Sequence, residues 1–525
     1  MGGEAGNLET FLKWASQLGI SDSTNPLQST TALCLGNSLF VSHFPDAGGR
    51  GLAAARELRK GELILRVPKS ALMTRESLLT DQKLAISVNG YSHLSSTQIL
   101  AVCLLAEIDK GKASMWYPYL VQLPRSYNIL ASFTWFETQA LQVEDAVWAA
   151  EKARSKAELD WKESVPVMKE LELRPQLLTF KSWLWASATI SSRTLHIPWD
   201  DAGCLCPVGD FFNYAAPEEA MPCSEDLRLT DGGYEEDISA YCFYARKSYK
   251  IGEQVEPPTK CLKLVQPYLC QLEENEGENS VEVHKSSCLL VGLGEKRAFQ
   301  TRREVLLSYG TYTNLELLEH YGFILDMNPN DKAFIELDAE ICSSSSWSKD
   351  TLYIQQDGKP SFTLLSALRL WATPPNQRKS VAHYAYSGSQ LSAENEMSAM
   401  RWMAKNCQIL LNKFPTKVED DDLLLHIIDK MQNFPLPKEV EYEQMMLAFG
   451  GEVGAFFEAN GLQKGGSGGD ITFSRKMIRS IERWKLVVQW RLRYKKILVD
   501  CISYCTEVVD FLSSENLLPN RSNNT

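Results

Sequence analysis

The stretch LSYGTYTNLELLEHYGF, which runs from Leu307 to Phe323, contains two tyrosine–glycine pairs, Tyr309-Gly310 and Tyr321-Gly322. Residues 304–309 (EVLLSY) combine apolar and aromatic side chains in the way that is typical of a strand. Tyrosine–glycine pairs are common in proteins, so this stretch is informative only through its order and spacing relative to other motifs. Its partners are three motifs that come earlier in the chain.

The three earlier motifs are short and follow one another in a definite order. The first is GRGLAAARELRKGELILRVP, residues 49–68; the second is residues 187–198, which include Arg193; the third is DFFNY, residues 210–214. Glycines such as Gly49 and Gly51 allow the backbone to approach a ligand with no side chain between them. Taken alone, the first motif is more simply explained as an ordinary hairpin, and an isolated arginine is by default a solvated surface residue.

The hydrophobic pattern changes its period along the chain. Residues 33–73 alternate as short strands, with a tight turn expected at residues 48–51, and residues 96–188 follow a helical period. Strand patterns return at residues 210–214, 241–246 and 304–309. A helical block is therefore inserted into a β framework.

Helical periodicity dominates residues 364–517, and the serine run at 343–346 predicts a linker before it. Five segments are expected: an N-terminal helix and linker (1–30), a first β part (31–95), a helical insert (96–188), a second β part (189–330) and a helical domain (340–517).

Together, in this order and spacing, the four motifs resemble the SET-domain protein methyltransferases, in particular the class of the Rubisco large-subunit lysine methyltransferase. The resemblance covers roughly residues 30–515. It implies an α+β fold, in which a SET β core with a helical insert is followed by an all-α substrate-binding domain. It also implies transfer of a methyl group from S-adenosylmethionine to a lysine side chain of a protein that binds to the helical domain, with no metal ion required.

The resemblance implies a set of cofactor-binding residues, namely Arg50, Gly51, Leu52, Arg193, Asp210, Asn213 and Tyr214. Main-chain groups at 50–52 would contact the amino-acid end of the cofactor, and the Arg193 guanidinium would clamp its carboxylate by two parallel charge-assisted bonds. The Asn213 amide can both donate and accept hydrogen bonds. From the residues alone, Asn213 is equally a turn residue or a satisfied buried amide.

The same resemblance implies two catalytic tyrosines, Tyr309 and Tyr321. A phenol near the transferred methyl group would accept weak C–H···O contacts, and Tyr321 would form part of a narrow channel for the substrate amine. Phe323 is expected to pack as channel wall or core. A desolvating channel lowers the pKa of an amine, so no dedicated base is expected.

Two departures from the family pattern are present. The family usually has Asn-His where this chain has Asn213-Tyr214, which would change cofactor affinity or the choice of target. Residues 256–304 intervene where relatives pass almost directly into the strand before Tyr309. A loop of this length inside a compact domain is usually functional or disordered. We expect a disordered surface insertion, of the kind that translated intron-like sequence would produce.

Composition narrows the remaining classes of function. A formal net charge of −12 disfavours nucleic acid as a partner, and no apolar run is long enough to cross a membrane. None of the 13 cysteines forms a Cys-x-x-Cys pair, so reduced thiols and no zinc site are expected. The acidic N-terminus lacks a signal or transit pattern, which predicts a cytoplasmic or nuclear protein, and we expect a monomer. Histidine methylation and a catalytically silent, protein-binding SET scaffold remain as alternatives.

Overall fold

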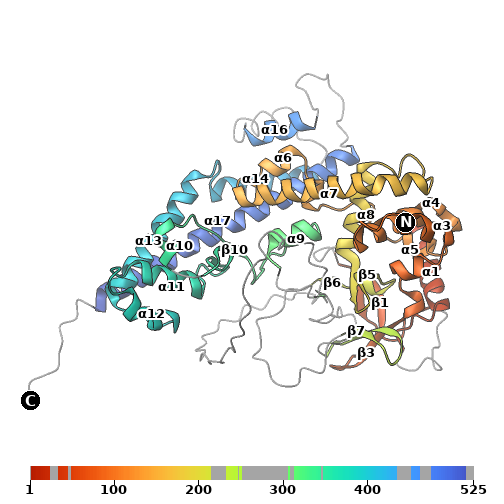
Figure 1. Cartoon of the computed structure of the whole chain (residues 1–525), viewed down its shortest axis with the longest axis horizontal. Coiled ribbons are helices and arrows are strands. Elements are labelled where there is room, and N and C mark those ends of the chain that lie inside the picture. Colours follow the sequence, from red (N-terminus) through yellow and green to blue (C-terminus); the bar gives the residue numbers. More distant parts are fainter. Residues whose placement is uncertain are drawn as a thin grey trace, which may run out of the picture. The chain divides into compact units, whose positions relative to one another are not determined.

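The structure is a computed structural model that describes residues 2–23, 33–44, 49–214, 232–245, 248–250, 306–307, 312–344, 347–433, 451–460 and 474–515 (Figure 1). The chain folds into two compact units. Unit 1 contains residues 1–123, 167–173 and 193–310, and unit 2 contains residues 124–166, 174–192 and 311–525.

Unit 1 contains several small sheets. Strands β1 (Leu39–Phe44) and β2 (Gly49–Ala54) form an antiparallel hairpin, and β4 (Thr194–Ile197) forms another with β5 (Asp200–Leu205). A three-stranded antiparallel sheet has the order β3 (Leu63–Pro68), β8 (Ala240–Tyr244) and β7 (Gly232–Glu235). The two-residue strands β6 (Asn213–Tyr214) and β9 (Leu306–Leu307) pair in parallel.

The helices of unit 1 are α1 (Gly2–Gln17), α2 (Arg75–Leu78), α3 (Gln82–Asn89), α4 (Ser96–Lys110) and α5 (Tyr117–Leu120). Helix α4 begins with a capping box, in which Ser95 accepts a bond from the Gln98 backbone and the Gln98 side chain accepts one from Ser95. Its residues 99–106 are all buried, so α4 is a central helix of this unit's core.

Unit 2 is mostly helical. Its helices are α6 (Trp135–Gln139), α7 (Glu144–Glu170), α8 (Phe180–Arg193), α9 (Asn314–His320), α10 (Ala339–Ser344), α11 (Phe362–Trp371), α12 (Arg378–Tyr386), α13 (Ala393–Lys413), α14 (Val418–Asn433), α16 (Glu452–Ala459) and α17 (Arg475–Glu515). The last turn of α7 and the last residue of α8 belong to unit 1. Strands β10 (Lys332–Ala333) and β11 (Ile354–Gln355) form a short antiparallel pair.

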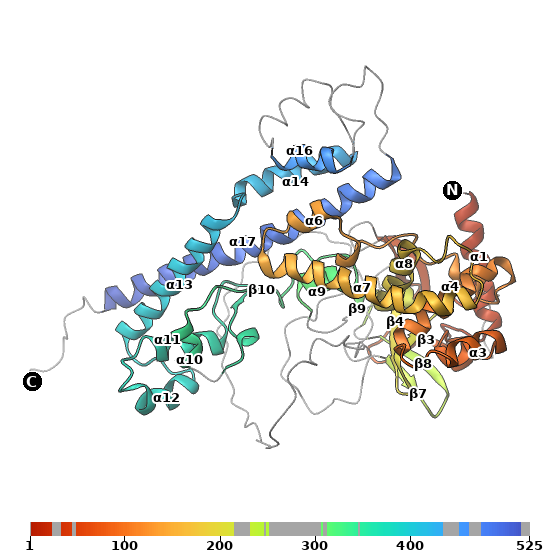
Figure 2. The ribbon, with the colours of Figure 1, turned by 45° about the horizontal axis from the view of Figure 1, so that its top comes forward.

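The long helix α17 organises the core of unit 2. Helix α13 packs along it, and the two lie side by side in both ribbon views (Figure 2). Nearer its N-terminus, the fully buried Trp484 stacks on Phe456 of α16 with ring centroids 4.5 Å apart, and Phe136 of α6 meets both rings edge-on. Burial of such large aromatic side chains stabilises the packing of these three helices.

A buried cluster of charged side chains also connects the helices of unit 2. Arg491 and Lys495 of α17 both donate to Asp421 of α14, at 2.7 Å and 2.6 Å, and none of the three is more than 1% exposed. Arg491 also donates to Glu452 of α16 and to the Ala140 carbonyl oxygen. Buried charges are tolerated only with such complete pairing, so this cluster fixes which helices can meet here.

The segment that carries Tyr321 is held by a side-chain clamp within unit 2. The fully buried Asn314 donates from its backbone and its side chain to the two carboxylate oxygens of Asp331, at 2.6 Å each, and its side-chain oxygen accepts from the backbone of Leu325. Gly322 has φ +76° and approaches Asn128 so closely that a Cβ atom would lie 2.7 Å from its backbone. Only glycine fits there, which explains the glycine of the second tyrosine–glycine pair.

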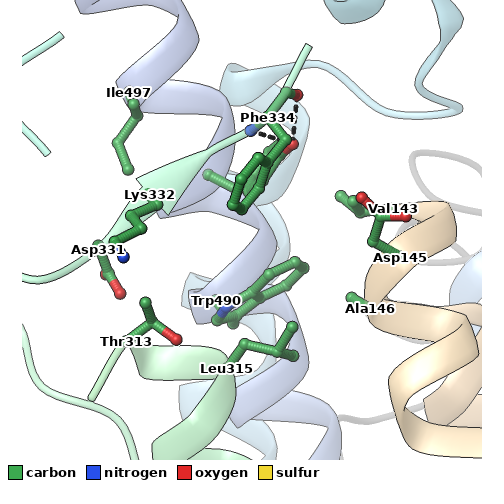
Figure 3. A pocket seen from close by; sticks show the side chains of 11 residues that line it. Val143, Asp145, Ala146, Thr313, Leu315, Asp331, Lys332, Phe334, Trp490 and Ile497 are labelled. Carbon is green, nitrogen blue, oxygen red and sulfur yellow. Dashed lines mark hydrogen bonds between the residues drawn. The ribbon is translucent and has the colours of Figure 1, made fainter. Parts of the chain in front are cut away.

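A cavity of about 100 Å³ lies in unit 2, beside this clamp (Figure 3). Its lining is mainly apolar and includes Leu315, Phe334 and Trp490, with Asp145 and Asp331 as acidic members. Tyr494 closes one side, where its hydroxyl donates to the Phe334 carbonyl and accepts from the Phe334 backbone nitrogen. None of the residues expected to bind the cofactor lines this cavity.

The predicted secondary structure differs from the observed one in several places. Residues 189–193, expected in the second β part, complete helix α8. Residues 49–51, expected in a tight turn, belong to strand β2, because they pair with residues 42–44 of β1. Residues 210–214, expected as one strand, form a 3-10 turn, η6 (Gly209–Phe211), and then the two-residue strand β6. Part of the serine run expected as a linker is helical, since α10 continues to Ser344.

Several sequence predictions stay predictions. The expected insertion 256–304 and Tyr309 lie outside the described residues. In the described part of the chain, no helix is both long and apolar enough to span a bilayer, and no three His, Cys, Asp or Glu side chains are grouped to hold a metal ion. The thiols of Cys34, Cys103, Cys204, Cys206, Cys242, Cys407, Cys501 and Cys505 are buried and free.

The buried cluster around Asp421 gives a stability prediction. Replacing Asp421 with Ala leaves the buried Lys495 ammonium without its carboxylate, so we expect a loss of about 3 kcal/mol or more in the free energy of unfolding. The matched control is Asp422→Ala on the same helix, which removes a half-exposed pair with Lys496 and should cost less than about 1 kcal/mol. Urea unfolding followed by tryptophan fluorescence measures both, and equal losses would contradict the prediction.

The Asn314–Asp331 clamp gives a prediction about pH. Burial raises the pKa of Asp331 from 3.8 to about 6, although the bonds from Asn314 oppose this shift. The folded state therefore binds this proton more tightly than the unfolded state, and ionisation above pH 6 costs stability. Compared with Asp331→Asn, the wild type should gain on the order of 1 kcal/mol in unfolding free energy as the pH falls from 7 to 5.

This pH dependence is measured by urea unfolding at both pH values. Asp338→Asn, at an exposed position a few residues away, controls for removal of a negative charge. A difference between wild type and Asp331→Asn that stays constant over this range would show that Asp331 ionises at an ordinary pH.

Candidate functional site

Arg193 and Asp210, two of the residues expected to bind the cofactor, form an ion pair in unit 1. Arg193 is the last residue of α8, and its Nη1 donates to the carbonyl oxygen of Asp210 at 3.0 Å and to Oδ2 of the same residue at 3.1 Å. The Asp210 side chain is 2% exposed and that of Arg193 is 22% exposed. The carboxylate is thus buried, whereas the Arg193 side chain is partly exposed.

The backbone around Asp210 is unusual, and this explains why the third motif is not a plain strand. Val208 has φ +71°, a left-handed conformation that is rare for a β-branched residue and costs on the order of 1–3 kcal/mol. Gly209 follows, and a Cβ atom there would lie 2.7 Å from both Cys206 Sγ and a carbon of the Phe243 ring. These two residues turn the chain into η6, which presents the Asp210 side chain to Arg193.

Arg50 is a second, partly buried cation in this region. Its two terminal nitrogens donate to the side-chain oxygen and the carbonyl oxygen of Gln122, at 2.7 Å and 2.8 Å, and its Cζ lies 4.0 Å from the ring centroid of Phe211. Burial lowers the pKa of the Arg50 guanidinium; the negative charge of Asp210 opposes this shift, and the positive charge of Arg193 adds to it. The three charged groups therefore interact as one cluster with a net positive charge.

Gly51 and Leu52, expected to make main-chain contacts, lie in β2 and are buried. They pair with Ser42 and Val41 of β1. Among the described strands β2 has β1 as its sole ladder partner, so backbone groups on its other edge take no part in this ladder. Main-chain recognition of a ligand by residues 50–52 remains a prediction.

Asn213 lies in β6, and its side-chain nitrogen Nδ2 is buried with no hydrogen-bond partner among the described residues. Asp210 Oδ1 has the same status. A buried donor or acceptor without a partner costs free energy, and such atoms commonly mark a place where a ligand supplies the missing bond. For Tyr214 the described structure is limited to the backbone, which pairs with Leu307.

Tyr321, one of the two expected catalytic residues, lies in unit 2, at the C-terminal end of α9. It is 8% exposed. Its ring contacts three aromatic neighbours, with centroids 6.0 Å from Tyr312, 6.4 Å from His320 and 6.0 Å from Phe323. This packing fixes the direction of the tyrosine within its own unit. The other expected catalytic residue, Tyr309, lies outside the described residues, and the roles of both remain predictions.

Three residues that contact predicted site residues were not predicted, two in unit 1 and one in unit 2. The hydroxyl of Tyr119 donates to Asp210 Oδ2 at 3.0 Å, Gln122 holds Arg50, and Tyr312 packs on Tyr321. Tyr119 and Gln122 lie within the predicted helical block and far from the motifs in sequence, so no local pattern indicates their contacts. Tyr312 lies inside the 307–323 motif, and its aromatic character was the available signal.

Comparison with known sequences identifies relatives over most of the chain. The protein is 51% identical over 528 residues to Protein SET DOMAIN GROUP 40 of Arabidopsis thaliana, and this match covers 96% of each chain. It is 23% identical over 457 residues to the actin-histidine N-methyltransferase of Gallus gallus, covering 80% of this chain and 63% of that protein. SET domain-containing protein 4 of Homo sapiens is 22% identical over 354 residues, covering 64% of this chain and 68% of that protein.

Solved structures support the same relationship at the level of fold. The SET domain of LSMT bound to lysine and AdoHcy matches with a TM-score of 0.52 at 15% identity, covering 98% of this chain and 92% of that one. Rubisco LSMT bound to AdoMet matches with a TM-score of 0.51 at 16% identity, covering 99% and 97%.

Residues 289–498 match the family described as Rubisco LSMT substrate-binding, and this match includes residues 289–304, the last part of the predicted insertion. The expected α+β fold and the expected family are confirmed. The chain belongs to the SET-domain methyltransferases of the Rubisco LSMT type, with a substrate-binding region of that type in its largely helical C-terminal part.

Proposed function

We propose that this protein transfers a methyl group from S-adenosylmethionine to a lysine side chain of a protein substrate. The observation that carries the proposal is a pair of buried atoms, Asp210 Oδ1 and Asn213 Nδ2, that have no hydrogen-bond partner within the described ranges; they lie in the same part of the chain as the Arg193–Asp210 ion pair. Its support from relatives is that LSMT structures of the same fold were solved with AdoMet, or with lysine and AdoHcy.

The residues present fit the amino-acid end of this cofactor. That end carries a carboxylate and an ammonium group, and the cluster of Arg50, Arg193 and Asp210 offers two cations and one anion. Arg193 would hold the carboxylate, because its side chain is partly exposed, whereas both terminal nitrogens of Arg50 donate to Gln122. Asp210 Oδ1 would accept a hydrogen bond from a bound ligand, and Asn213 Nδ2 would donate one.

When bound, S-adenosylmethionine supplies an electrophilic methyl group on a positively charged sulfur. The work of the chain is then to align the amine with this methyl group and to exclude water. Tyr321, buried among Tyr312, His320 and Phe323, would line the channel that admits the amine. The predicted role of Tyr309 is to accept weak C–H···O contacts from the transferred methyl group. An apolar channel lowers the pKa of the lysine amine, so the neutral nucleophile forms without a separate base.

Histidine methylation is the second candidate. The observation in its favour is that several relatives at 22–23% identity are named actin-histidine N-methyltransferases. The decisive experiment incubates the protein with a cell extract and isotope-labelled S-adenosylmethionine, followed by mass spectrometry of the labelled peptides. Label on a lysine nitrogen supports the proposal, and label on imidazole supports the alternative.

The third candidate is a SET scaffold that binds proteins but does not catalyse methyl transfer. Tyr214, in place of the usual histidine, and the sequence at 256–304 are the features that favour it. Calorimetric titration with S-adenosylmethionine separates the candidates, since such a scaffold would give no binding heat.

The role of Arg193 leads to a prediction for cofactor binding. Replacing Arg193 with Ala removes the group that would hold the cofactor carboxylate, so the dissociation constant for S-adenosylhomocysteine should rise at least about tenfold. Arg193→Lys keeps the charge but loses the planar fork and should fall between wild type and Arg193→Ala. The exposed Arg59, mutated to Ala, is the control, and calorimetry is the measurement. An unaltered constant in Arg193→Ala would remove Arg193 from the cofactor site.

The two motif tyrosines lead to a prediction for catalysis. Tyr309→Phe and Tyr321→Phe should each retain the fold and cofactor binding and lower the rate of methyl transfer at least about tenfold, because the hydroxyl acts mainly in the transition state. Tyr384→Phe, at an exposed position of α12, is the control. The rates are compared with the labelled cofactor once a methylated protein has been identified. Full activity in either variant would exclude a catalytic role for that hydroxyl.

A further inference from the structure

The hydroxyl of Tyr119 is a further polar group that contacts Asp210. Tyr119 lies in α5, is fully buried, and donates to Asp210 Oδ2 at 3.0 Å across 91 residues of sequence. Arg193 donates to the same oxygen at 3.1 Å. Two donors from separate segments of unit 1 therefore converge on one oxygen of a carboxylate whose other oxygen, Oδ1, has no partner among the described residues.

This asymmetry determines the orientation of the carboxylate. A carboxylate that accepts a hydrogen bond from a single donor can turn about its Cβ–Cγ bond and offer the other oxygen to that donor. Its two oxygens are chemically equivalent, so little is lost in this exchange. With both Tyr119 and Arg193 on Oδ2, rotation would break two hydrogen bonds, so Oδ1 stays directed away from both donors, where the part of the chain that the structure describes supplies it no partner. The same restraint holds the Arg193 guanidinium, since Nη1 is bound to both the side chain and the backbone of Asp210.

Aromatic packing explains the position of the Tyr119 ring but not the need for a hydroxyl. The ring packs on Phe11 at 6.2 Å, and Phe11 packs on Phe211 at 5.4 Å. A phenylalanine at position 119 would keep these apolar contacts. The hydroxyl is therefore the part of the residue whose contribution goes beyond the core.

We propose that Tyr119 is a positioning residue for the amino-acid end of the cofactor, acting through Asp210 on Arg193. This inference rests on the proposed function. Tyr119 does not contact the reacting groups; it keeps the carboxylate and the guanidinium in the orientation that the cofactor meets on binding. Its effect is consequently specific to ligands that carry the amino-acid end, and it leaves recognition of the nucleoside unaffected.

The test compares two ligands in the full-length protein. S-Adenosylhomocysteine carries the amino-acid end, and 5′-methylthioadenosine lacks it. In Tyr119→Phe, the dissociation constant for S-adenosylhomocysteine should rise about tenfold, as for loss of a hydrogen bond to a charged group, while that for 5′-methylthioadenosine changes less than about twofold. Calorimetry measures the first ligand directly, and displacement of the first by the second measures the weaker binder.

Tyr117→Phe, on the same short helix, is the matched control and should leave both constants unchanged. The ratio of the two constants within each variant does not depend on the fraction of protein that is folded, so a partly unfolded variant still tests the inference. An equal rise for both ligands, or no rise for either, would overturn it. If the wild type binds neither ligand, the proposed function itself fails. If the wild type binds normally and Tyr119→Phe behaves identically, only the inference about Tyr119 fails.

Discussion

The candidate site depends on one buried carboxylate, that of Asp210. It joins the end of α8 through Arg193, the short helix α5 through Tyr119, and its own 3-10 turn. A buried ion pair is weak evidence for stability, because desolvation of both ions offsets much of their attraction. Its value here is specificity, since a charge that must be paired permits few arrangements of the segments that carry its partners.

This arrangement requires a strained backbone conformation beside Asp210. Val208 adopts a left-handed φ, and Gly209 stands where any side chain would collide with Cys206 and Phe243. In unit 2, Gly322 is required for the same steric reason, where the chain passes close to Asn128. Both glycines neighbour residues of the predicted site, Asp210 and Tyr321. Strained or crowded backbone at these positions is consistent with selection for side-chain placement over local stability.

Sequence patterns predicted the fold class and the family because both depend on the order of motifs along the chain. They predicted that the helical insert ends at residue 188, whereas α8 continues to Arg193. They failed where a local signal is compatible with two structures. The glycines at 49 and 51 suit a turn as well as the strand β2. The 210–214 motif has the pattern of a strand, but the backbone at Val208 turns the chain into a 3-10 turn. Contacts such as Tyr119–Asp210 could not be predicted, because they depend on tertiary packing across 91 residues.

Helix α17 combines two packing tasks in a single uninterrupted element of 41 residues, about 60 Å long. Trp484 faces α6 and α16 near one end of the helix, and Cys501 and Cys505 are buried toward the other end. Helix α13 also packs against α17. Each residue added to or removed from an α-helix turns everything beyond it by about 100°. Evolution can therefore exchange side chains along α17, but a change in its length between these two regions would point one buried face toward water. The length of α17 therefore fixes the relative orientation of its two buried faces in unit 2.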